Sequence, residues 1–432
     1  MQISYLTAGA AGMFCGSCLH DNALAKSLMR LGHDVILLPT YTPILTDETS
    51  VSSDRLFFGG LNVYLQQVSP IFRWIPKWMD QFLSSPRLVN WIASRAMGTS
   101  AKQLGALTVS MLQGSDGRQR KEVSRLCDWL VTQKPDVAIF SNLLIAGCIR
   151  EVKSRIGCPV VVMLQGDDIF YEGLIEPYRS EALKLLKRLA QDVDLFIVHS
   201  DFYGQRMQQL LEFPRERWQV NTLAIEPSDF LNHQPVAHPD ARTMSPTVGY
   251  LARLAPEKGL HQLVDAFIEL RKRLPKAQLA IAGWLGKQHE SYWQEQQDKL
   301  ASAGLADAYT YHGSVDRAGK LKFLEAIDVL CVPTTYQEPK GLFVLEALAA
   351  GVPVVQPAHG AFPELIDRLG GGHLFVAGDR AALVDRLEMV LSDLPAAQEL
   401  GQAGRAAVLK LATTDQAAAR LVDMLNPLVA KK

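Results

Sequence analysis

Two glutamates near residue 340 carry the strongest chemical signal in the sequence. A buried strand predicted over 328–333 ends in a loop that holds Glu338, and a helix predicted to begin near Gly341 carries Glu346. Ligands of parallel α/β sheets bind at the carboxyl ends of the strands, and the first amides of a helix favour an anion. Gly341 lets a ligand approach the backbone closely, and each carboxylate can accept two hydroxyl groups, as from sugar rings. The alternative is two solvated glutamates, but Glu346 lies in the apolar run 342–350, where an unpaired charge is costly.

A basic motif directly after another predicted strand offers a partner for an anion. Pro256 and Glu257 fit a helix start, and Arg253 and Lys258 add positive charge at the positive end of that helix dipole. This arrangement is unfavourable unless an anion binds there. A diphosphate would suit both side chains, since arginine offers a fork and lysine a point charge. Alternatively the two cations are solvated, with Glu257 offsetting Lys258.

The elements that must position these groups form two alternating series of strands and helices. The first series opens with a strand over 3–7, a glycine-rich loop and a helix from Asp21 with Leu24, Leu28 and Leu31 on one face. Further buried strands are predicted over 35–38, 137–140, 160–164 and 195–198, and in the second series over 248–251, 279–282, 329–332 and 352–355. A proline-rich polar stretch, 227–246, separates the two series as an interdomain linker. The pattern predicts an α/β protein of two facing, doubly wound, parallel-sheet domains.

Composition is typical of a water-soluble globular chain. The 432 residues are 48% hydrophobic and have a formal net charge of −1, so no global attraction to nucleic acid is expected. Six cysteines are too sparse for a disulfide scaffold. No signal peptide and no apolar run of about 18 residues is visible, so we expect a cytoplasmic protein.

Together, the two motifs resemble the retaining glycosyltransferases of family 4. The likeness covers most of the C-terminal half, including 282–284, 312–315 and 351–355, and is weaker over 24–35. It implies the GT-B fold, in which two Rossmann-like domains face each other across a cleft. The implied domains are an acceptor-side domain over 1–236 with a helical insertion at about 41–120, a nucleotide-sugar domain over 246–410, and a helix over 411–432 that crosses back to the N-terminal domain.

The resemblance also implies roles for individual residues. Arg253 and Lys258 would bind the donor diphosphate and stabilise its developing charge, so they count as catalytic together with Glu338, which would hold the sugar hydroxyls. Glu346 would bind the ribose. The implied donor-binding residues are Arg253, Lys258, Glu338, Lys340, Gly341, Leu342 and Glu346. Lys340 departs from the family, which usually has an aromatic residue there; it either contacts the phosphate or sugar, or faces solvent.

The implied reaction moves a hexose from a UDP- or GDP-sugar to a hydroxyl acceptor with retention of anomeric configuration. UDP-glucose or a similar donor is favoured, the acceptor would be a glycan, a lipid-linked sugar or a small molecule, and no metal or other cofactor is expected. One alternative is a catalytically degenerate sugar-nucleotide-binding protein of the same fold. A dehydrogenase or epimerase is disfavoured, because Gly-x-Gly-x-x-Gly and an acidic residue ending the second strand are missing.

The acceptor side is predicted at two loops of the N-terminal half. Gly16 and Ser17 occupy the position of the family's glycine-rich loop. Gln165 and Asp167 stand where many relatives carry a histidine after a strand. They would bind the sugar or orient an acceptor hydroxyl, or they would form a capped turn.

Three short motifs have a simpler structural explanation. Cys15-x-x-Cys18 lacks a second pair to complete a zinc site, so small residues shaping a tight loop are favoured. His20 followed by Asp21 is either a general base with its orienting group or a helix cap. The motif 192–194, Asp-Val-Asp, leads straight into a strand, so a structural role is favoured over metal binding.

The stretch 72–102 combines aromatic and basic residues. Its five aromatic residues include three tryptophans, and its basic residues exceed its acidic ones by four. It is either a surface that docks on anionic lipid at the inner face of the membrane, or a helical insertion whose tryptophans pack on the domain. The second interpretation is favoured, since two prolines limit any long amphipathic helix.

Overall fold

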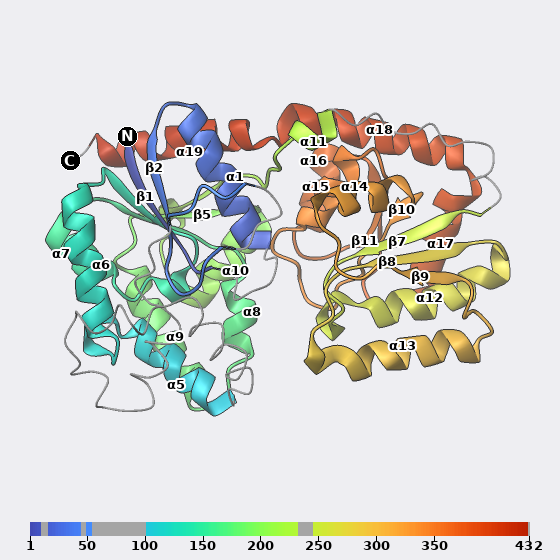
Figure 1. The fold of residues 1–432 in the computed structure, drawn as a ribbon, viewed down its shortest axis with the longest axis horizontal. Helices are drawn as coiled ribbons and strands as arrows, with labels where there is room; N and C mark the ends of the chain where they lie inside the picture. The colour runs from blue at the N-terminus through green and yellow to red at the C-terminus, as the bar shows by residue number, and fades with distance from the viewer. Residues whose placement is uncertain (10–15, 45–48, 54–100, 232–244, 431–432) are drawn as a thin grey trace. The chain divides into compact units, whose positions relative to one another are not determined.

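A computed structural model describes residues 1–9, 16–44, 49–53, 101–231 and 245–430. The chain divides into two compact units (Figure 1). Unit 1 comprises Met1–Thr222 and Ala417–Lys432, and unit 2 comprises Leu223–Gln416. Each unit holds a six-stranded sheet in which all neighbouring strands are parallel.

Unit 1 is built from an alternating series of strands and helices. Its strands are β1 (Gln2–Thr7), β2 (Asp34–Pro39), β3 (Val137–Phe140), β4 (Val160–Met163), β5 (Leu195–Val198) and β6 (Trp218–Val220). Its described helices are α1 (Gly16–Arg30), α5 (Ala101–Leu112), α6 (Arg120–Gln133), α7 (Ile149–Ile156), α8 (Asp167–Glu172), α9 (Tyr178–Ala190), α10 (Asp201–Leu211) and most of α19 (Thr414–Val429). Short 3-10 helices are η2 (Gly114–Asp116), η3 (Leu143–Ile145) and η4 (Arg215–Arg217).

Unit 2 repeats the same alternation. Its strands are β7 (Thr247–Leu251), β8 (Gln278–Ala282), β9 (Tyr309–Tyr311), β10 (Val329–Leu330), β11 (Val354–Pro357) and β12 (Gly372–Phe375). Its described helices are α11 (Ser228–Leu231), α12 (Leu260–Arg273), α13 (Glu290–Ser302), α14 (Arg317–Glu325), α15 (Leu342–Ala349), α16 (Phe362–Leu369), α17 (Arg380–Ser392) and α18 (Leu394–Leu411), with 3-10 helices η6 (Pro256–Lys258) and η7 (Lys287–His289).

Strand order places a topological switch point in each sheet. Unit 1 has the order β2-β1-β3-β4-β5-β6 and unit 2 the order β12-β11-β10-β7-β8-β9. In unit 1 the chain runs outward from β1 to β2 and then returns to β3 on the other side of β1. In unit 2 it runs from β7 out to β9 and returns to β10 beside β7. The loops that follow β1 and β3, and β7 and β10, therefore lie where doubly wound folds bind ligands.

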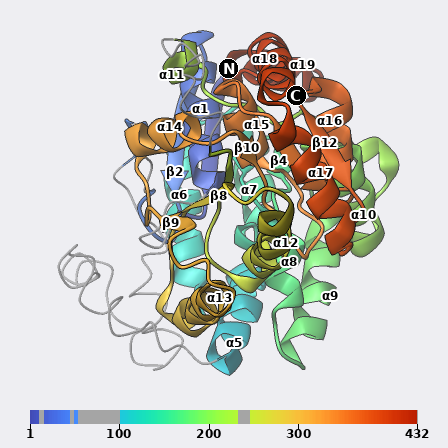
Figure 2. The ribbon, with the colours of Figure 1, turned by 90° about the vertical axis from the view of Figure 1, so that its right-hand side faces the viewer.

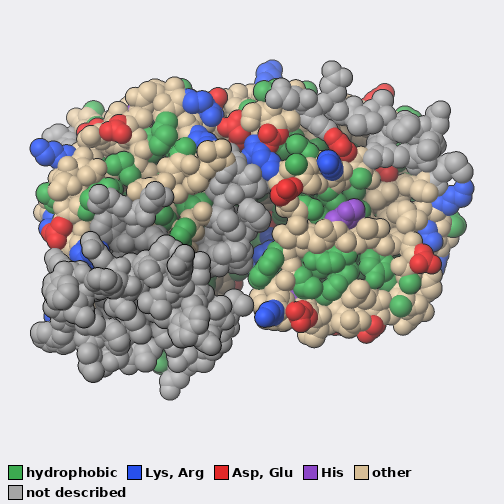
Figure 3. Space-filling view, viewed as in Figure 1, with side chains coloured by type: hydrophobic (Ala, Val, Ile, Leu, Met, Phe, Trp, Pro, Cys, Tyr) green, Lys and Arg blue, Asp and Glu red, His purple; other side chains and the backbone are tan. Residues whose placement is uncertain are grey.

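The central strands are apolar runs because helices cover both of their faces. β3, β4 and β5 are buried at every residue. In unit 2, α12 packs against α13 and α17, while α15 and α16 pack against α18 (Figures 1 and 2). Leu263, Phe267 and Leu270 form the core face of α12 and are fully buried. Figure 3 shows acidic and basic side chains interspersed over the described part of one face of the molecule.

Nine predicted strands are present, and the differences from prediction lie at their margins. α1 begins at Gly16 instead of Asp21. The prediction that Leu31 lies on the core face of this helix is wrong, because Leu31 follows the last turn and is exposed. Strands β6, β9 and β12 were not predicted. The chain enters unit 2 at Leu223, ahead of the predicted boundary at residue 236, because Leu223, Ile225 and Phe230 pack into the unit 2 core despite their proline-rich surroundings.

Candidate functional site

Two loops meet at the switch point of unit 2, directly after β7 and β10. Gly259 closes η6 with a φ of +73°, in the left-handed region that glycine favours. A Cβ atom on this residue would lie 1.7 Å from the carbonyl oxygen of Pro333. Glycine therefore allows the loop after β7 to approach the loop after β10 closely, which brings the basic motif to the glutamate motif.

The two motifs meet in a buried cluster of Lys258, Tyr336 and Glu338. The Lys258 ammonium donates to Glu338 Oε2 at 2.8 Å and to the Tyr336 hydroxyl at 2.5 Å. The Tyr336 hydroxyl in turn donates to Glu338 Oε2. Lys258 Nζ also lies 4.9 Å from the centre of the Tyr336 ring. The cluster joins residues almost 80 positions apart in the sequence.

Glu338 is ionised in spite of its burial. Its residue is only 5% exposed. Burial alone would raise the pKa of its carboxyl group, but the charge and hydrogen bond of Lys258, the Tyr336 hydroxyl and the charge of Lys340 together lower that pKa to about 2. The carboxylate therefore stays a hydrogen-bond acceptor at any physiological pH.

Glu338 also lies at the start of α15. Gly341 caps this helix with a φ of +75°, and Leu342 is its first residue. The amides of Lys340 and Gly341 both lie 3.4 Å from Glu338 Oε1. Lys340 is buried and its charge acts on Glu338, so the alternative of a solvent-facing Lys340 is wrong. The helix start and the two lysines make this corner favourable for an anion.

The remaining predicted donor residues form ion pairs of their own. Arg253 Nη2 lies 3.2 Å from Glu257 Oε1, and both side chains are more than a third exposed. The alternative in which Glu257 offsets Lys258 is therefore wrong, because Glu257 pairs with Arg253 and Lys258 pairs with Glu338. Glu346 accepts a 2.7 Å hydrogen bond from Lys320, and both side chains are mostly buried.

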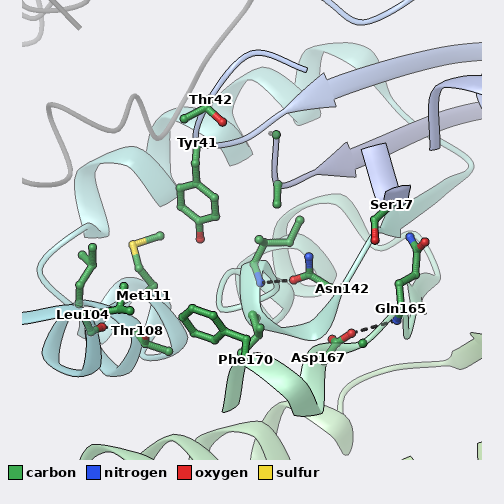
Figure 4. Close-up of a pocket in the computed structure, with 16 residues that line it drawn as sticks. Ser17, Tyr41, Thr42, Leu104, Thr108, Met111, Asn142, Gln165, Asp167 and Phe170 are labelled. Carbon is green, nitrogen blue, oxygen red and sulfur yellow. Dashed lines mark hydrogen bonds between the residues drawn. The ribbon is translucent and has the colours of Figure 1, made fainter. Parts of the chain in front are cut away.

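At the switch point of unit 1 the chain forms a pocket of about 600 Å³. Ser17, Asn142, Gln165 and Asp167 lie toward one end, and Phe170 belongs to the other end (Figure 4). The pocket brings together three of the four residues predicted for the acceptor side. The fourth, Gly16, begins α1 next to Ser17.

Asp167 holds the turn between β4 and α8. Its carboxylate accepts hydrogen bonds from the amide of Leu143 at 2.6 Å and from the amide of Gln165 at 3.0 Å. Burial raises the pKa of Asp167 to about 6, although these two backbone hydrogen bonds oppose the rise and the nearby Asp168 adds to it. The structure thus supports the turn interpretation of Asp167, while the same carboxylate lines the pocket.

Gln165 is fixed by a buried network around Asp21. Its Nε2 donates to Asp21 Oδ1 at 2.9 Å and to the Ser141 carbonyl at 3.1 Å. Asp21 also accepts from the hydroxyls of Tyr5 and Thr7, each at 2.7 Å. The helix-cap alternative for His20 and Asp21 is wrong, because both residues lie inside α1, where Asp21 ties the helix to β1.

The other short motifs have structural roles where they are described. Asp192 accepts from Arg150 at 2.8 Å, and Asp194 accepts from Lys153 at 2.7 Å, which supports the structural interpretation of 192–194. Cys18 is buried in α1, and Cys15 lies outside the described residues. Within the described part of the chain, no three His, Cys, Asp or Glu residues are grouped to hold a metal ion.

Some contributors could not be predicted from local sequence. Tyr336 stands two residues before Glu338, and its position in the glutamate motif was the available signal. Lys320 comes from another helix, and no local pattern connects it with Glu346. The aromatic and basic stretch 72–102 lies outside the described residues as far as residue 100. Among the described helices, none is long and apolar enough to span a bilayer.

Part of the chain is similar to a known protein family. Residues 237–407 match the family of glycosyl transferases group 1. The phosphatidyl-myo-inositol mannosyltransferase of Mycobacterium leprae is 32% identical over 186 residues, which span 40% of this chain and 47% of that protein. The glycogen synthase of Mycobacterium tuberculosis is 26% identical over 389 residues, covering 89% of this chain and 84% of that protein.

The fold is also shared with a solved structure. The crystal structure of Anabaena HepE in complex with UDP superimposes with a TM-score of 0.69 at 16% identity, over 99% of this chain and all of that one. The chain thus spans about half the length of the mannosyltransferase, most of the glycogen synthase and all of HepE. Residues 237–407 are thus similar to the glycosyl transferases group 1 family, and the chain as a whole has the two-domain, Rossmann-like GT-B fold.

Proposed function

We propose that this chain is a retaining hexosyltransferase that uses a nucleoside-diphosphate sugar and a hydroxyl acceptor. The observation that carries the proposal is the Lys258–Tyr336–Glu338 cluster at the unit 2 switch point. It joins a cation that suits a diphosphate to an ionised, buried carboxylate that suits sugar hydroxyls, beside the start of α15.

In this proposal, the bound donor replaces one partner in each of two ion pairs of the chain. The diphosphate takes the place of Glu338 as a partner of Lys258, and Arg253 contributes a second cation. Glu338 then accepts hydrogen bonds from hydroxyls of the donor sugar, and Glu346 leaves Lys320 to accept the ribose hydroxyls. Because Arg253, Lys258 and Glu346 each have an ion-pair partner within the chain, none of these charges depends on a ligand for a partner.

The proposed chemistry follows from where charge develops. The acceptor oxygen attacks the anomeric carbon on the face from which the diphosphate leaves, the bond from that carbon to the phosphate oxygen breaks, and the acceptor proton passes to the departing phosphate. Negative charge grows on the diphosphate during this step. Arg253, Lys258 and the amides of Gly341 and Leu342 would stabilise it, so the proposal requires no metal ion.

The donor base and sugar are narrower parts of the proposal. HepE, which has the same fold, is described in complex with UDP, and this supports a nucleoside diphosphate as the bound group. We favour UDP-glucose or a similar hexose donor. The experiment below distinguishes uridine from guanosine and adenosine.

Thermal unfolding with UDP, GDP, ADP and NAD tests the donor site. A ligand at about 100 times its dissociation constant should stabilise the wild type by about 2.7 kcal/mol. Glu346→Ala removes charged hydrogen bonds to the ribose and should weaken binding about 30-fold, which reduces the stabilisation to about 1 kcal/mol. The two proteins are compared by the change in melting temperature that each ligand causes, because loss of the ion pair with Lys320 can itself change the melting temperature of the variant.

Glu399→Ala is the matched control, because Glu399 is an exposed glutamate of α18 in the same unit. This variant should retain the full shift. Stabilisation by NAD alone, or by none of the four ligands, would contradict the proposal. A nucleotide-induced shift without sugar transfer to any acceptor would instead identify a degenerate sugar-nucleotide-binding protein.

A further inference from the structure

We propose that the unit 1 pocket selects an amphipathic acceptor, namely a sugar hydroxyl carried on an alkyl chain. This inference rests on the proposed function, because it names the acceptor class for the same reaction. It is carried by the division of the pocket into a polar and an apolar end.

The polar end lies at the carboxyl ends of β1, β3 and β4. Ser17, Asn142, Gln165 and Asp167 line it. Each carboxylate oxygen of Asp167 accepts a hydrogen bond from a backbone amide. Each also has a further lone pair that can accept a hydrogen bond from a hydroxyl group. This end can therefore hold the hydroxylated head of an acceptor.

The other end is mostly apolar and comes from two helices. Leu104, Thr108 and Met111 of α5 and Phe170 of α8 lie there (Figure 4), and the Thr108 hydroxyl donates to the Leu104 carbonyl. The Tyr41 ring lies over the same region, with its hydroxyl directed toward the space between Met111 and Phe170 (Figure 4). A free monosaccharide bound at the polar end would leave these side chains facing water.

The apolar surface continues to the rim of the pocket. Leu104 and Phe170 line the pocket and are each 39% exposed, while Ile169, next to Phe170 on α8, is exposed to the same degree. A volume of about 600 Å³ is within the range of pockets that hold drug-sized molecules. An alkyl chain that follows the apolar wall from the polar end would cover this surface and gain the free energy of burial.

A series of alkyl β-D-glucosides tests the inference directly. Binding of the methyl, butyl, hexyl and octyl compounds to the full chain is measured by calorimetry, below the concentrations at which they form micelles. The dissociation constant should fall about fourfold for each added methylene until the apolar end is filled, and then level off. A dissociation constant that does not change with chain length would overturn the inference.

Substitutions at the apolar end locate the effect. Met111→Gln keeps a side chain of similar length, and Phe170→Ala changes a partly exposed rim residue, so the fold should be retained. Each substitution should raise the dissociation constant of octyl glucoside about tenfold and leave that of methyl glucoside unchanged. Val131→Gln, at an exposed valine of α6 outside the pocket lining, should change neither. Equal effects of all three substitutions would also overturn the inference.

The same series in Lys258→Met separates this inference from the proposed function. This variant removes a donor-site cation in unit 2, so chain-length-dependent binding should persist in it while sugar transfer is lost. If nucleotides bind to the wild type but the glucosides do not distinguish chain length, the inference about the acceptor fails alone. If the glucosides bind as expected but no sugar nucleotide is used, the proposed function fails instead and the pocket has no acceptor to select.

Discussion

Glu338 in unit 2 and Asp167 in unit 1 are two buried carboxyl groups, each of which follows a strand of its own sheet. Glu338 lies in the loop after β10, Asp167 is the first residue of α8 after β4, and each is about 5% exposed. Burial raises the pKa of both groups. In Glu338 the neighbouring Lys258 and Tyr336 reverse that effect and bring the pKa to about 2, whereas Asp167 has mainly backbone amides as partners and its pKa is about 6.

The difference shows that a repeated architecture supplies the position of a site and not its chemistry. Unit 2 surrounds its carboxylate with cations and the start of a helix, which suits a charged ligand. Unit 1 places its carboxylate at the polar end of a pocket whose other end is mostly apolar, which suits a neutral ligand. The two groups should also affect stability in opposite ways as the pH changes.

The largest expected effect comes from removing the cation beside Glu338. Lys258→Met leaves a buried carboxylate without its ion pair, so the free energy of unfolding at pH 7 should fall by about 3 to 5 kcal/mol. Sugar transfer should fall by about 10² to 10³-fold, since a stabiliser of the departing diphosphate is lost. Urea unfolding and the rate of donor consumption measure the two effects.

The double variant Lys258→Met with Glu338→Gln is the control. Removing the stranded charge should recover part of the lost stability without restoring transfer. A double variant no more stable than Lys258→Met alone would show that the pair does not govern the ionisation of Glu338.

The second prediction concerns Asp167 and its pH dependence. Its pKa is about 6 in the folded chain against 3.8 ordinarily, so the folded state binds the proton more tightly than the unfolded state. The free energy of unfolding should therefore decrease as the pH rises, by about 2 kcal/mol from this group between pH 4 and pH 6. Glu338 acts in the opposite sense, because its contribution is full above pH 4.5 and is lost as the pH falls toward 2.

Asp167→Asn tests this sign. Relative to the variant, the wild type should lose about 2 kcal/mol between pH 4 and pH 6, as followed by urea unfolding at each pH. Asp423→Asn, at an exposed aspartate of α19, should give the wild-type profile. A difference between wild type and Asp167→Asn that stays constant over this range would contradict the assignment.

The smallest effect is expected from Tyr336→Phe. The substitution removes a hydroxyl that accepts from Lys258 and donates to Glu338, and it should reduce the free energy of unfolding by about 1 kcal/mol. The pKa of Glu338 should rise, so acid destabilisation should begin at a higher pH than in the wild type. If the acid limb of the stability profile does not move, the hydroxyl does not help to hold Glu338 ionised.

Much of the unit 2 site could be predicted, because its residues stand in two short motifs that each follow an apolar strand. Their pairing could not be predicted in the same way. The charge of Glu257 seemed the nearest partner for Lys258, but the fold brings Glu338 closer. In unit 1 the sequence indicated Ser17, Gln165 and Asp167, and it gave no sign of the apolar end, where residues of α5 and α8 lie.

The sequence by itself determined the alternating α/β architecture, its division into two halves and the central strands. Strands such as β3 and β5 are covered on both faces, so each appears as a continuous apolar run. Only the tertiary structure decided β6, β9 and β12, which are edge strands of the two sheets and carry a weaker apolar signal because part of each is exposed. It likewise decided which charges pair and where the pocket opens, since those contacts join residues that are distant in the chain and adjacent only after the strands have been ordered.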